Sequence, residues 1–237
     1  MFFSDHQLED GFSAILAPNV VWGGHPISNT PGLVKGAAKE VGSVEALKNA
    51  HPIRIAEFMG GRYSAYLALK KAGIKEWPEM MERLGRVPIW PEGFVGSISH
   101  SRQQAIAVAS STEHYMGLGI DIEPLLTESN AIALARYFMV PDEKVVDLRT
   151  QPYSGWVSLL VSMKESIYKA CHQAFNINLN FQNICISDVD WKSGVVSIML
   201  RFDQQAPWQA LPNIPTGRFF ITNSSLISLV TVGIASN

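Results

Sequence analysis

Two acidic residues, Asp121 and Glu123, stand two positions apart in the stretch Gly119–Glu123, whose composition is typical of a β-strand. Side chains at i and i+2 of a strand lie on one face, so both carboxylates point the same way while Ile120 and Ile122 face the core. Paired carboxylate oxygens suit Mg²⁺, which usually keeps waters and substrate phosphates in its other positions. The alternative is an exposed strand face that carries two solvated acids.

A second group of charged residues, Lys164, Glu165 and Lys169, lies on a helix predicted over Gly155–Ala174, whose apolar residues form one stripe. Glu165 and Lys169 are four positions apart and are therefore neighbours on one helical face. Taken alone, they would be an ordinary surface ion pair. Combined with the two strand acids, they match what a metal–pyrophosphate site needs: carboxylates to hold the metal, lysines to offset phosphate charge, and one carboxylate as a base.

A serine and a histidine, Ser99 and His100, follow one another where the predicted strand Val95–Ser99 ends. Adjacent residues of a strand point to opposite faces, so these two cannot act as a nucleophile and its base. The G-x-S-x-G turn of the α/β-hydrolases is also missing from this stretch. A strand end with small residues and a histidine instead suits a phosphate contact, and the alternative is a histidine in an exposed loop.

Three arginines add candidate anion contacts. Arg54 and Arg62, with Phe58 between them, step by four along a helix predicted over Pro52–Lys71, so both can point the same way. Arg86 stands in a loop between Gly85 and Pro88, where a fixed cation could hold a phosphate. This last signal is weak, because many surface loops have the same composition.

The composition narrows the function classes. The chain has 237 residues, of which 47% are hydrophobic, so a sizeable core is expected. Its 19 basic and 21 acidic residues nearly balance, which argues against a nucleic-acid-binding surface. The two cysteines match no zinc pattern and are expected to be reduced. We find no secretory signal and no apolar stretch long enough to span a membrane, and therefore expect a cytoplasmic protein.

The predicted helices and strands alternate without a βαβ rhythm, so the expected fold class is α+β. Turn-forming residues and one short helix near Val44–Asn49 are expected in the first 50 residues, and Gly73 is expected to end the helix from Pro52. The paired Gly60–Gly61 inside that helix predicts the close approach of a strand or a ligand. The other expected helices are Ala131–Phe138 and Asp142–Asp147, and the other expected strands are Ala105–Ala109, Gly117–Glu123, Ile184–Asp188, Val195–Phe202, Arg218–Ile221 and Leu226–Ile234.

Four segments of the chain match a known family in sequence: R-I-A-E-F-M-G-G-R (Arg54–Arg62), G-R-V-P-I-W-P-E-G-F-V-G-S-I-S-H-S (Gly85–Ser101), G-L-G-I-D-I-E (Gly117–Glu123) and S-M-K-E-S-I-Y-K-A (Ser162–Ala170). In this order they resemble the 4′-phosphopantetheinyl transferases of the surfactin-synthetase and enterobactin-synthetase type, the enterobactin branch most, and the similarity covers about half of the chain. One departure is Val161, where the enterobactin branch often has phenylalanine.

The resemblance implies two similar lobes, residues 1–112 and 113–237, each a small antiparallel sheet packed on a helix. A pseudo-twofold axis would relate the lobes, with coenzyme A in the cleft between them. The resemblance further implies that Asp121, Glu123 and Glu165 ligate Mg²⁺, that His100, Lys164 and Lys169 contact the phosphates or the pantetheine arm, and that Arg62 and Arg86 contact the 3′-phosphate. Arg54 and Ser99 lie in the same matching segments and are counted with the cofactor-binding residues.

The reaction implied is the transfer of 4′-phosphopantetheine from coenzyme A to a serine of an apo acyl, aryl or peptidyl carrier protein, with release of 3′,5′-ADP. Glu165 is the candidate base, directly or through a metal-bound water, and Lys169 would stabilise the developing charge. Two alternatives are a metal-dependent phosphohydrolase acting on a nucleotide pyrophosphate and a non-catalytic module that binds coenzyme A. A monomer is expected, and Phe138, Met139 and Val140 are candidates either for an apolar carrier contact or for the core. The pattern is compatible with carriers of siderophore, polyketide, polyunsaturated-lipid or fatty-acid synthesis.

Overall fold

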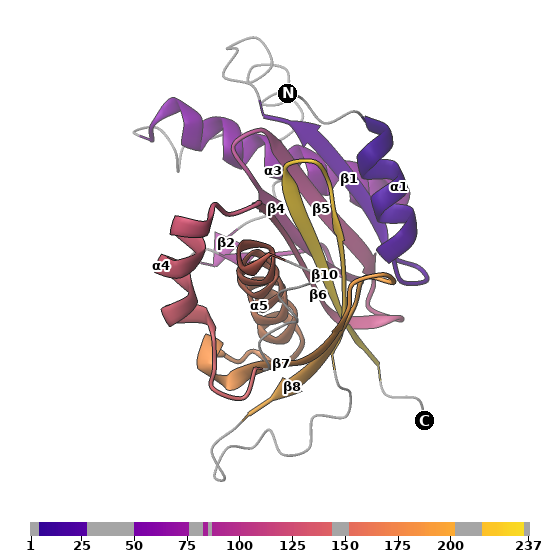
Figure 1. Ribbon diagram of the computed structural model, residues 1–237. Coiled ribbons are helices and arrows are strands. Elements are labelled where there is room, and N and C mark those ends of the chain that lie inside the picture. Colours follow the sequence, from indigo (N-terminus) through magenta and orange to yellow (C-terminus); the bar gives the residue numbers. More distant parts are fainter. Residues whose placement is uncertain are drawn as a thin grey trace. The chain divides into compact units, whose positions relative to one another are not determined.

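The computed structural model describes residues 5–27, 50–75, 83–84, 87–143, 152–201 and 215–234 (Figure 1). The helix expected near Val44–Asn49 and the loop residue Arg86 lie outside these residues, as does most of the helix expected over Asp142–Asp147. The chain divides into two compact units. The α3 unit is Pro18–His114 and contains helix α3 (Pro52–Lys71); the α5 unit is Phe3–Ala17 with Tyr115–Asn237 and contains helix α5 (Tyr153–Phe175).

The α3 unit is built on a three-stranded antiparallel sheet in the order β1-β5-β4. Helix α3 packs on all three strands through small and apolar side chains such as Ala65, Ala68 and Leu69. The strands are β1 (Val21–Pro26), β4 (Phe94–His100) and β5 (Gln104–Ser111), and a separate two-stranded ladder pairs β2 (Arg83–Leu84) with β3 (Val87–Pro88).

Two glycines explain how closely α3 approaches this sheet. A Cβ on Gly61 would lie 2.9 Å from Ile98 of β4, and a Cβ on Gly60 would lie 3.3 Å from Ala105 of β5. The paired glycines therefore mark the close approach of strands rather than of a ligand. The helix ends as expected: Gly73 has φ +106°, a left-handed conformation that glycine adopts without strain.

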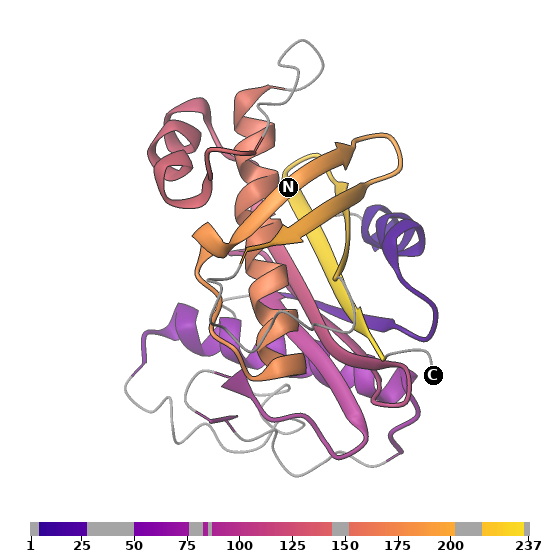
Figure 2. The ribbon, with the colours of Figure 1, turned by 90° about the horizontal axis from the view of Figure 1, so that it is seen from below.

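The α5 unit is built on a five-stranded antiparallel sheet in the order β6-β10-β9-β8-β7. Helix α5 lies along this sheet, as Figure 2 shows, and contacts β6 and β10 most extensively. The strands are β6 (Tyr115–Pro124), β7 (Ile184–Asp190), β8 (Val195–Leu200), β9 (Thr216–Ile221) and β10 (Ser225–Gly233); α4 (Glu128–Phe138) and a 3₁₀ turn, η2 (Phe181–Asn183), complete the unit together with α1 (Asp5–Ile15).

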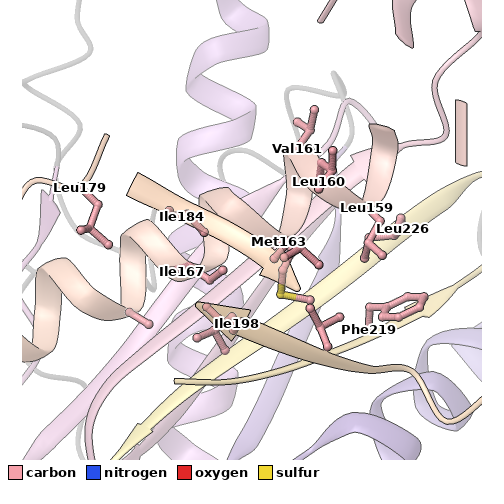
Figure 3. Close-up of a cluster of buried hydrophobic side chains, with 14 of the residues drawn as sticks. Leu159, Leu160, Val161, Met163, Ile167, Leu179, Ile184, Ile198, Phe219 and Leu226 are labelled. Carbon is pink, nitrogen blue, oxygen red and sulfur yellow. The ribbon is translucent and has the colours of Figure 1, made fainter. Parts of the chain in front are cut away.

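The core of the α5 unit lies between α5 and its sheet. Met163 of α5 points toward Ile198 of β8 and Phe219 of β9 (Figure 3). These side chains are at most 8% exposed, and at about 25 cal/mol per Å² such burial is the main stabilising contribution to the unit. The helix ends at Asn176, which adopts φ 54° and closes the last turn onto His172.

The first described helix, α1, is an element that the sequence pattern did not indicate. Its buried residues Leu8, Phe12 and Ile15 form one face, and the ring of Phe12 meets that of Phe220 edge to face at 5.4 Å. A Cβ on Gly11 would lie 2.2 Å from the Phe220 ring, so this helix packs where only a glycine fits. Helix α1 therefore belongs to the α5 unit although the rest of that unit begins at Tyr115.

The α+β class is confirmed, with antiparallel ladders in every described sheet. The strand expected over Gly117–Glu123 lies within β6, and the helix expected over Gly155–Ala174 lies within α5. The helix expected from Asp142 is not formed at its start, because residues 141–143 are in turn and bend conformations.

Candidate active site

Two glycines of β6 let α5 lie directly against the strand that carries the candidate metal ligands. A Cβ on Gly119 would lie 1.8 Å from the carbonyl oxygen of Ser166, and a Cβ on Gly117 would lie 2.3 Å from that of Ala170. No side chain, not even a methyl group, fits at such distances. Because alternate residues of a strand share a face, Asp121 lies on the same α5-facing side as these glycines.

An ion pair joins the two elements at this point. Lys169 Nζ of α5 donates to Asp121 Oδ1 at 2.8 Å and to the carbonyl oxygen of Ile120 at 2.9 Å. The Asp121 side chain is 5% exposed and that of Lys169 is 27% exposed. A pair so nearly removed from water holds its geometry more firmly than an exposed pair would.

Glu123 and Glu165 stand close enough to this pair to influence each other's ionisation. Burial, and after it the charges of Asp121 and Glu165, together raise the pKa of Glu123 to about 7 against the opposing effect of Lys169. Burial likewise raises the pKa of Glu165, with a smaller upward contribution from Asp121. The site thus concentrates three acids against one cation, which is the charge pattern that a divalent metal would relieve.

The donor chemistry therefore fits Mg²⁺, although the acids are not drawn together as a formed ligand set. Among the residues that the structure describes, no three His, Cys, Asp or Glu side chains are arranged to hold a metal ion. The ammonium group of Lys169 lies against Asp121 Oδ1, where it supplies the positive charge itself.

The raised pKa of Glu123 predicts a pH-dependent stability difference in the absence of divalent cations. The carboxyl of Glu123 binds its proton more readily in the folded chain than in the unfolded chain, whose pKa lies near 4.5. Its ionisation therefore costs stability increasingly between about pH 4.5 and 7, and the cost is constant above that range. Glu123→Gln removes the cost, so its stability relative to wild type should rise between pH 5 and pH 8.

Urea unfolding at several pH values in the presence of a chelator measures this difference. Glu113→Gln is the matched control, because Glu113 is exposed in a turn of the other unit. A stability difference for Glu123→Gln that stays flat with pH would contradict the prediction.

Three buried hydroxyls fix α5 on β10 beside the acids. Ser228 Oγ lies 2.8 Å from both Ser162 Oγ and Ser166 Oγ, and all three side chains are fully buried. Ser228 is also the cross-strand partner of Asp121 in the β6–β10 ladder. These contacts anchor α5 on both sides of Glu165 along the helix.

Lys164, predicted to contact the cofactor, is instead fully buried. Its Nζ lies 2.7 Å from Glu143 Oε1 and donates to the carbonyl oxygens of Phe138 and Phe181. Burial lowers the pKa of Lys164, while the hydrogen bond that Lys164 donates to Glu143 opposes that effect. In this conformation the ammonium group connects α5 to the end of α4 and to η2.

Glu143 completes this buried connection from the turn after α4. Its Oε2 accepts from the backbone N–H of Val140, and its Oε1 accepts from that of Ile186 in β7. Both carboxylate oxygens and the ammonium group of Lys164 are therefore satisfied, which a buried ion pair requires. Phe138 and Val140 lie at this junction, so the structure assigns them packing contacts, with Phe138 stacked on Phe181 at 4.7 Å.

The α3 unit brings together some of its predicted anion contacts. Arg54 Nη1 lies 3.1 Å from His100 Nε2, while Arg62 is 5% exposed with its guanidinium 5.2 Å from the centre of the Phe58 ring. Ser99 is not part of this group: His100 and Ile98 face α3, so Ser99 points to the opposite face of β4.

Two models of one family match consecutive parts of the chain. The "4′-phosphopantetheinyl transferase N-terminal domain" matches residues 43–110, and the "4′-phosphopantetheinyl transferase superfamily" model matches residues 117–222, which include β6 and α5. The chain belongs to the 4′-phosphopantetheinyl transferase superfamily.

Several curated relatives in the superfamily are similar to the chain. Enterobactin synthase component D of Salmonella typhimurium is 36% identical over 127 residues, which are 53% of this chain and 52% of the relative. The 4′-phosphopantetheinyl transferase Svp of Streptomyces mobaraensis is 32% identical over 133 residues, 56% and 54% of the two chains. PptT of Mycobacterium tuberculosis, also named a 4′-phosphopantetheinyl transferase, is 30% identical over 149 residues, 61% and 64%. The chain spans about half the length of the curated relatives it matches first.

Sequence reasoning missed three residues that hold candidate side chains in place, each within its own unit. Glu57 contacts both Arg54 and His100, and its spacing of three from Arg54 on a helix was a usable signal. Glu143 and Ser228 reach α5 from distant segments, where no local pattern marks them. His25 of β1 was also missed: it shares with His100 the β5 partner Ala105, and burial lowers its pKa.

Proposed function

We propose that this chain transfers the 4′-phosphopantetheine group from coenzyme A to a serine of an apo carrier protein and releases 3′,5′-ADP. The observation that carries the proposal is the consecutive match of two phosphopantetheinyl transferase models, the second of which includes the acid-bearing strand β6 and the helix α5 packed on it. The relatives named enterobactin synthase component D and 4′-phosphopantetheinyl transferase support the same reaction.

The family resemblance extends the proposal to the arrangement of the chain. The two lobes expected from the resemblance, residues 1–112 and 113–237, would be related by a pseudo-twofold axis with coenzyme A between them, except that helix α1 is counted with the second lobe because it belongs to the α5 unit. A monomeric, cytoplasmic protein remains the expectation, and none of the described helices has the length and apolarity of a membrane span.

Asp121, Glu123 and Glu165 would hold Mg²⁺, which when bound would offset the negative charge that builds on the pyrophosphate. The support is their oxygen-donor chemistry and the grouping of the three acids, in which the charges of Asp121 and Glu165 add to burial in raising the pKa of Glu123.

Lys169 would add a hydrogen-bond donor for the phosphates. An ammonium group has three N–H donors, and the described contacts of Lys169 use two of them, on Asp121 and on Ile120. The third would be available to a phosphate oxygen while the other two keep the side chain in place.

The carrier serine would attack the β-phosphorus of coenzyme A. A new bond forms between the serine oxygen and phosphorus, the bond to the 3′,5′-ADP oxygen breaks, and the serine loses its proton. Glu165 is the proposed acceptor of that proton, directly or through a water. Its raised pKa makes it a stronger base than an exposed glutamate.

In the α3 unit, Arg54, Arg62 and His100 would contact the 3′-phosphate and its neighbouring groups. A contact of Arg86 with the 3′-phosphate stays a prediction, because Arg86 lies outside the described residues. Lys164 has no such role in the proposal, because its ammonium group is buried against Glu143.

Mass spectrometry of an apo carrier protein incubated with the full chain, coenzyme A and Mg²⁺ tests the proposal. The expected result is a gain of one phosphopantetheine mass on the carrier and none on a carrier whose acceptor serine is replaced by alanine. A panel of siderophore, polyketide, polyunsaturated-lipid and fatty-acid carriers would identify the preferred partner. Cleavage of coenzyme A without carrier modification would support a phosphohydrolase instead, and binding without any reaction would support a non-catalytic module.

A further inference from the structure

The side chains of Arg54 and His100 are held together by a third residue, Glu57. Arg54 Nη1 lies 3.3 Å from Glu57 Oε2 and 3.1 Å from His100 Nε2, and the same Glu57 oxygen lies 4.0 Å from His100 Nε2. The Glu57 side chain is 18% exposed, compared with 44% for Arg54 and 32% for His100. The acid is thus the most buried member of the group and lies beneath two more exposed cation-forming side chains.

The hydrogen-bond chemistry of this group defines what Glu57 does. The guanidinium of Arg54 can only donate, and its Nη1 carries two hydrogens, which match the two acceptors Glu57 Oε2 and His100 Nε2. A free arginine side chain loses rotamer entropy when it is ordered. Glu57 restrains this side chain before any ligand arrives, so less of that loss is left for binding.

A parallel contact restrains the second arginine of the helix. The guanidinium of Arg62 lies 5.2 Å from the centre of the Phe58 ring, one turn earlier on α3. The adjacent residues Glu57 and Phe58 therefore each hold one arginine, Arg54 and Arg62 respectively. The ring carries no charge, so Glu57 alone combines restraint of an arginine with a contact to His100.

We propose that Glu57 is a positioning residue that sets Arg54 and His100 to receive a phosphate monoester and thereby sets the preference for coenzyme A over 3′-dephospho-coenzyme A. The inference rests on the proposed function for the identity of the phosphate. Glu57 itself does not touch the ligand, because its charge would repel it. Its effect passes through Arg54 and His100.

The test compares carrier modification by the full chain with coenzyme A and with 3′-dephospho-coenzyme A. Glu57→Ala should lower the ratio of kcat/KM for the two substrates about tenfold, the size expected for one misplaced charge-assisted hydrogen bond. Glu57→Gln keeps an acceptor oxygen for Arg54 and should retain most of the preference. Glu113→Gln, an exposed acid of the same unit, should leave the ratio unchanged.

The proposal would be overturned if Glu57→Ala left the ratio of kcat/KM unchanged. It would also be overturned if kcat/KM fell equally with both substrates, because that result marks a merely structural role. A higher ratio would overturn it as well, because it would show that Glu57 repels the phosphate. Calorimetric binding of 3′,5′-ADP and 5′-AMP separates this inference from the proposed function. If no carrier is modified, the positioning role still requires that Glu57→Ala weaken the binding of 3′,5′-ADP more than the binding of 5′-AMP. Equal weakening, or no binding of 3′,5′-ADP to the wild-type chain, would refute it.

Discussion

Replacing Lys164 with methionine is expected to lower the free energy of unfolding by about 3–5 kcal/mol, because it leaves the buried carboxylate of Glu143 without its cation. Methionine matches the length of the lysine stem, so the loss reflects the ion pair rather than an empty cavity. The carbonyl oxygens of Phe138 and Phe181 would lose their donor in the same variant, which adds to the cost.

A second variant distinguishes the buried charge from the packing around it. In the double variant Lys164→Met with Glu143→Leu, no charge stays buried, so much of the lost stability should return. Recovery should be incomplete, because the N–H groups of Val140 and Ile186 then lose their acceptor. Urea unfolding measures all variants, with the exposed Lys192→Met as the control. If Lys164→Met alone were as stable as wild type, the result would contradict the buried ion pair between Lys164 and Glu143.

A methyl group at Gly119 is expected to cost about 3 kcal/mol of stability or more and to displace α5 from β6. The Cβ of Gly119→Ala would lie 1.8 Å from the carbonyl oxygen of Ser166 and 3.0 Å from the N–H nitrogen of Ala170. Both are backbone atoms inside a regular helix, so neither can turn aside as a side chain would. The helix must move as a body, and Lys169 must move with it.

Two separate measurements follow this change: thermal unfolding reports the loss of stability, and the carrier-modification assay reports the displacement of Lys169 from Asp121. The control is Gly233→Ala at the end of β10, where no atom lies within 4 Å of the added methyl group. Gly119→Ala should lose both stability and carrier modification, whereas Gly233→Ala should lose neither. Wild-type stability in Gly119→Ala would show that α5 does not pack on β6 as described.

The residues that share a face were predictable from local geometry. The period of two in β6 places Asp121 and Glu123 together, and the spacing of four in α5 makes Glu165 and Lys169 neighbours. The roles of these residues in metal binding and catalysis stay predictions. The glycines of G-L-G-I-D-I-E had no assigned role, because the need for them arises only from a helix that follows about 40 residues later.

The surroundings of Lys164 could not be predicted in the same way. Its position beside Glu165 suggested a shared site, but adjacent helical residues point about 100° apart, so one can face the acids while the other faces the interior. Its partner Glu143 lies in an irregular turn whose pattern indicated a helix start. Only the tertiary packing of α4, η2 and β7 makes that turn the place where the lysine is neutralised.

Helix α1 shows a signal that was present but hidden. Leu8, Phe12 and Ile15 have the spacing of one helical face, while Gly11 and the following turn residues favour an irregular segment. The glycine is required by the ring of Phe220, more than 200 positions away. A residue that weakens the local helix thus permits the contact that stabilises it.

This contact has a consequence for synthesis on the ribosome. The α3 unit is continuous in sequence, so it can fold as soon as its last strand, β5, has left the exit tunnel. Helix α1 is made before that unit but packs on β9, near the end of the chain. Helix α1 must therefore wait for β9, which is made about 200 residues later, and closing so long a loop is slow compared with local folding. During that interval the apolar face of α1, which carries Leu8, Phe12 and Ile15, has no partner to cover it.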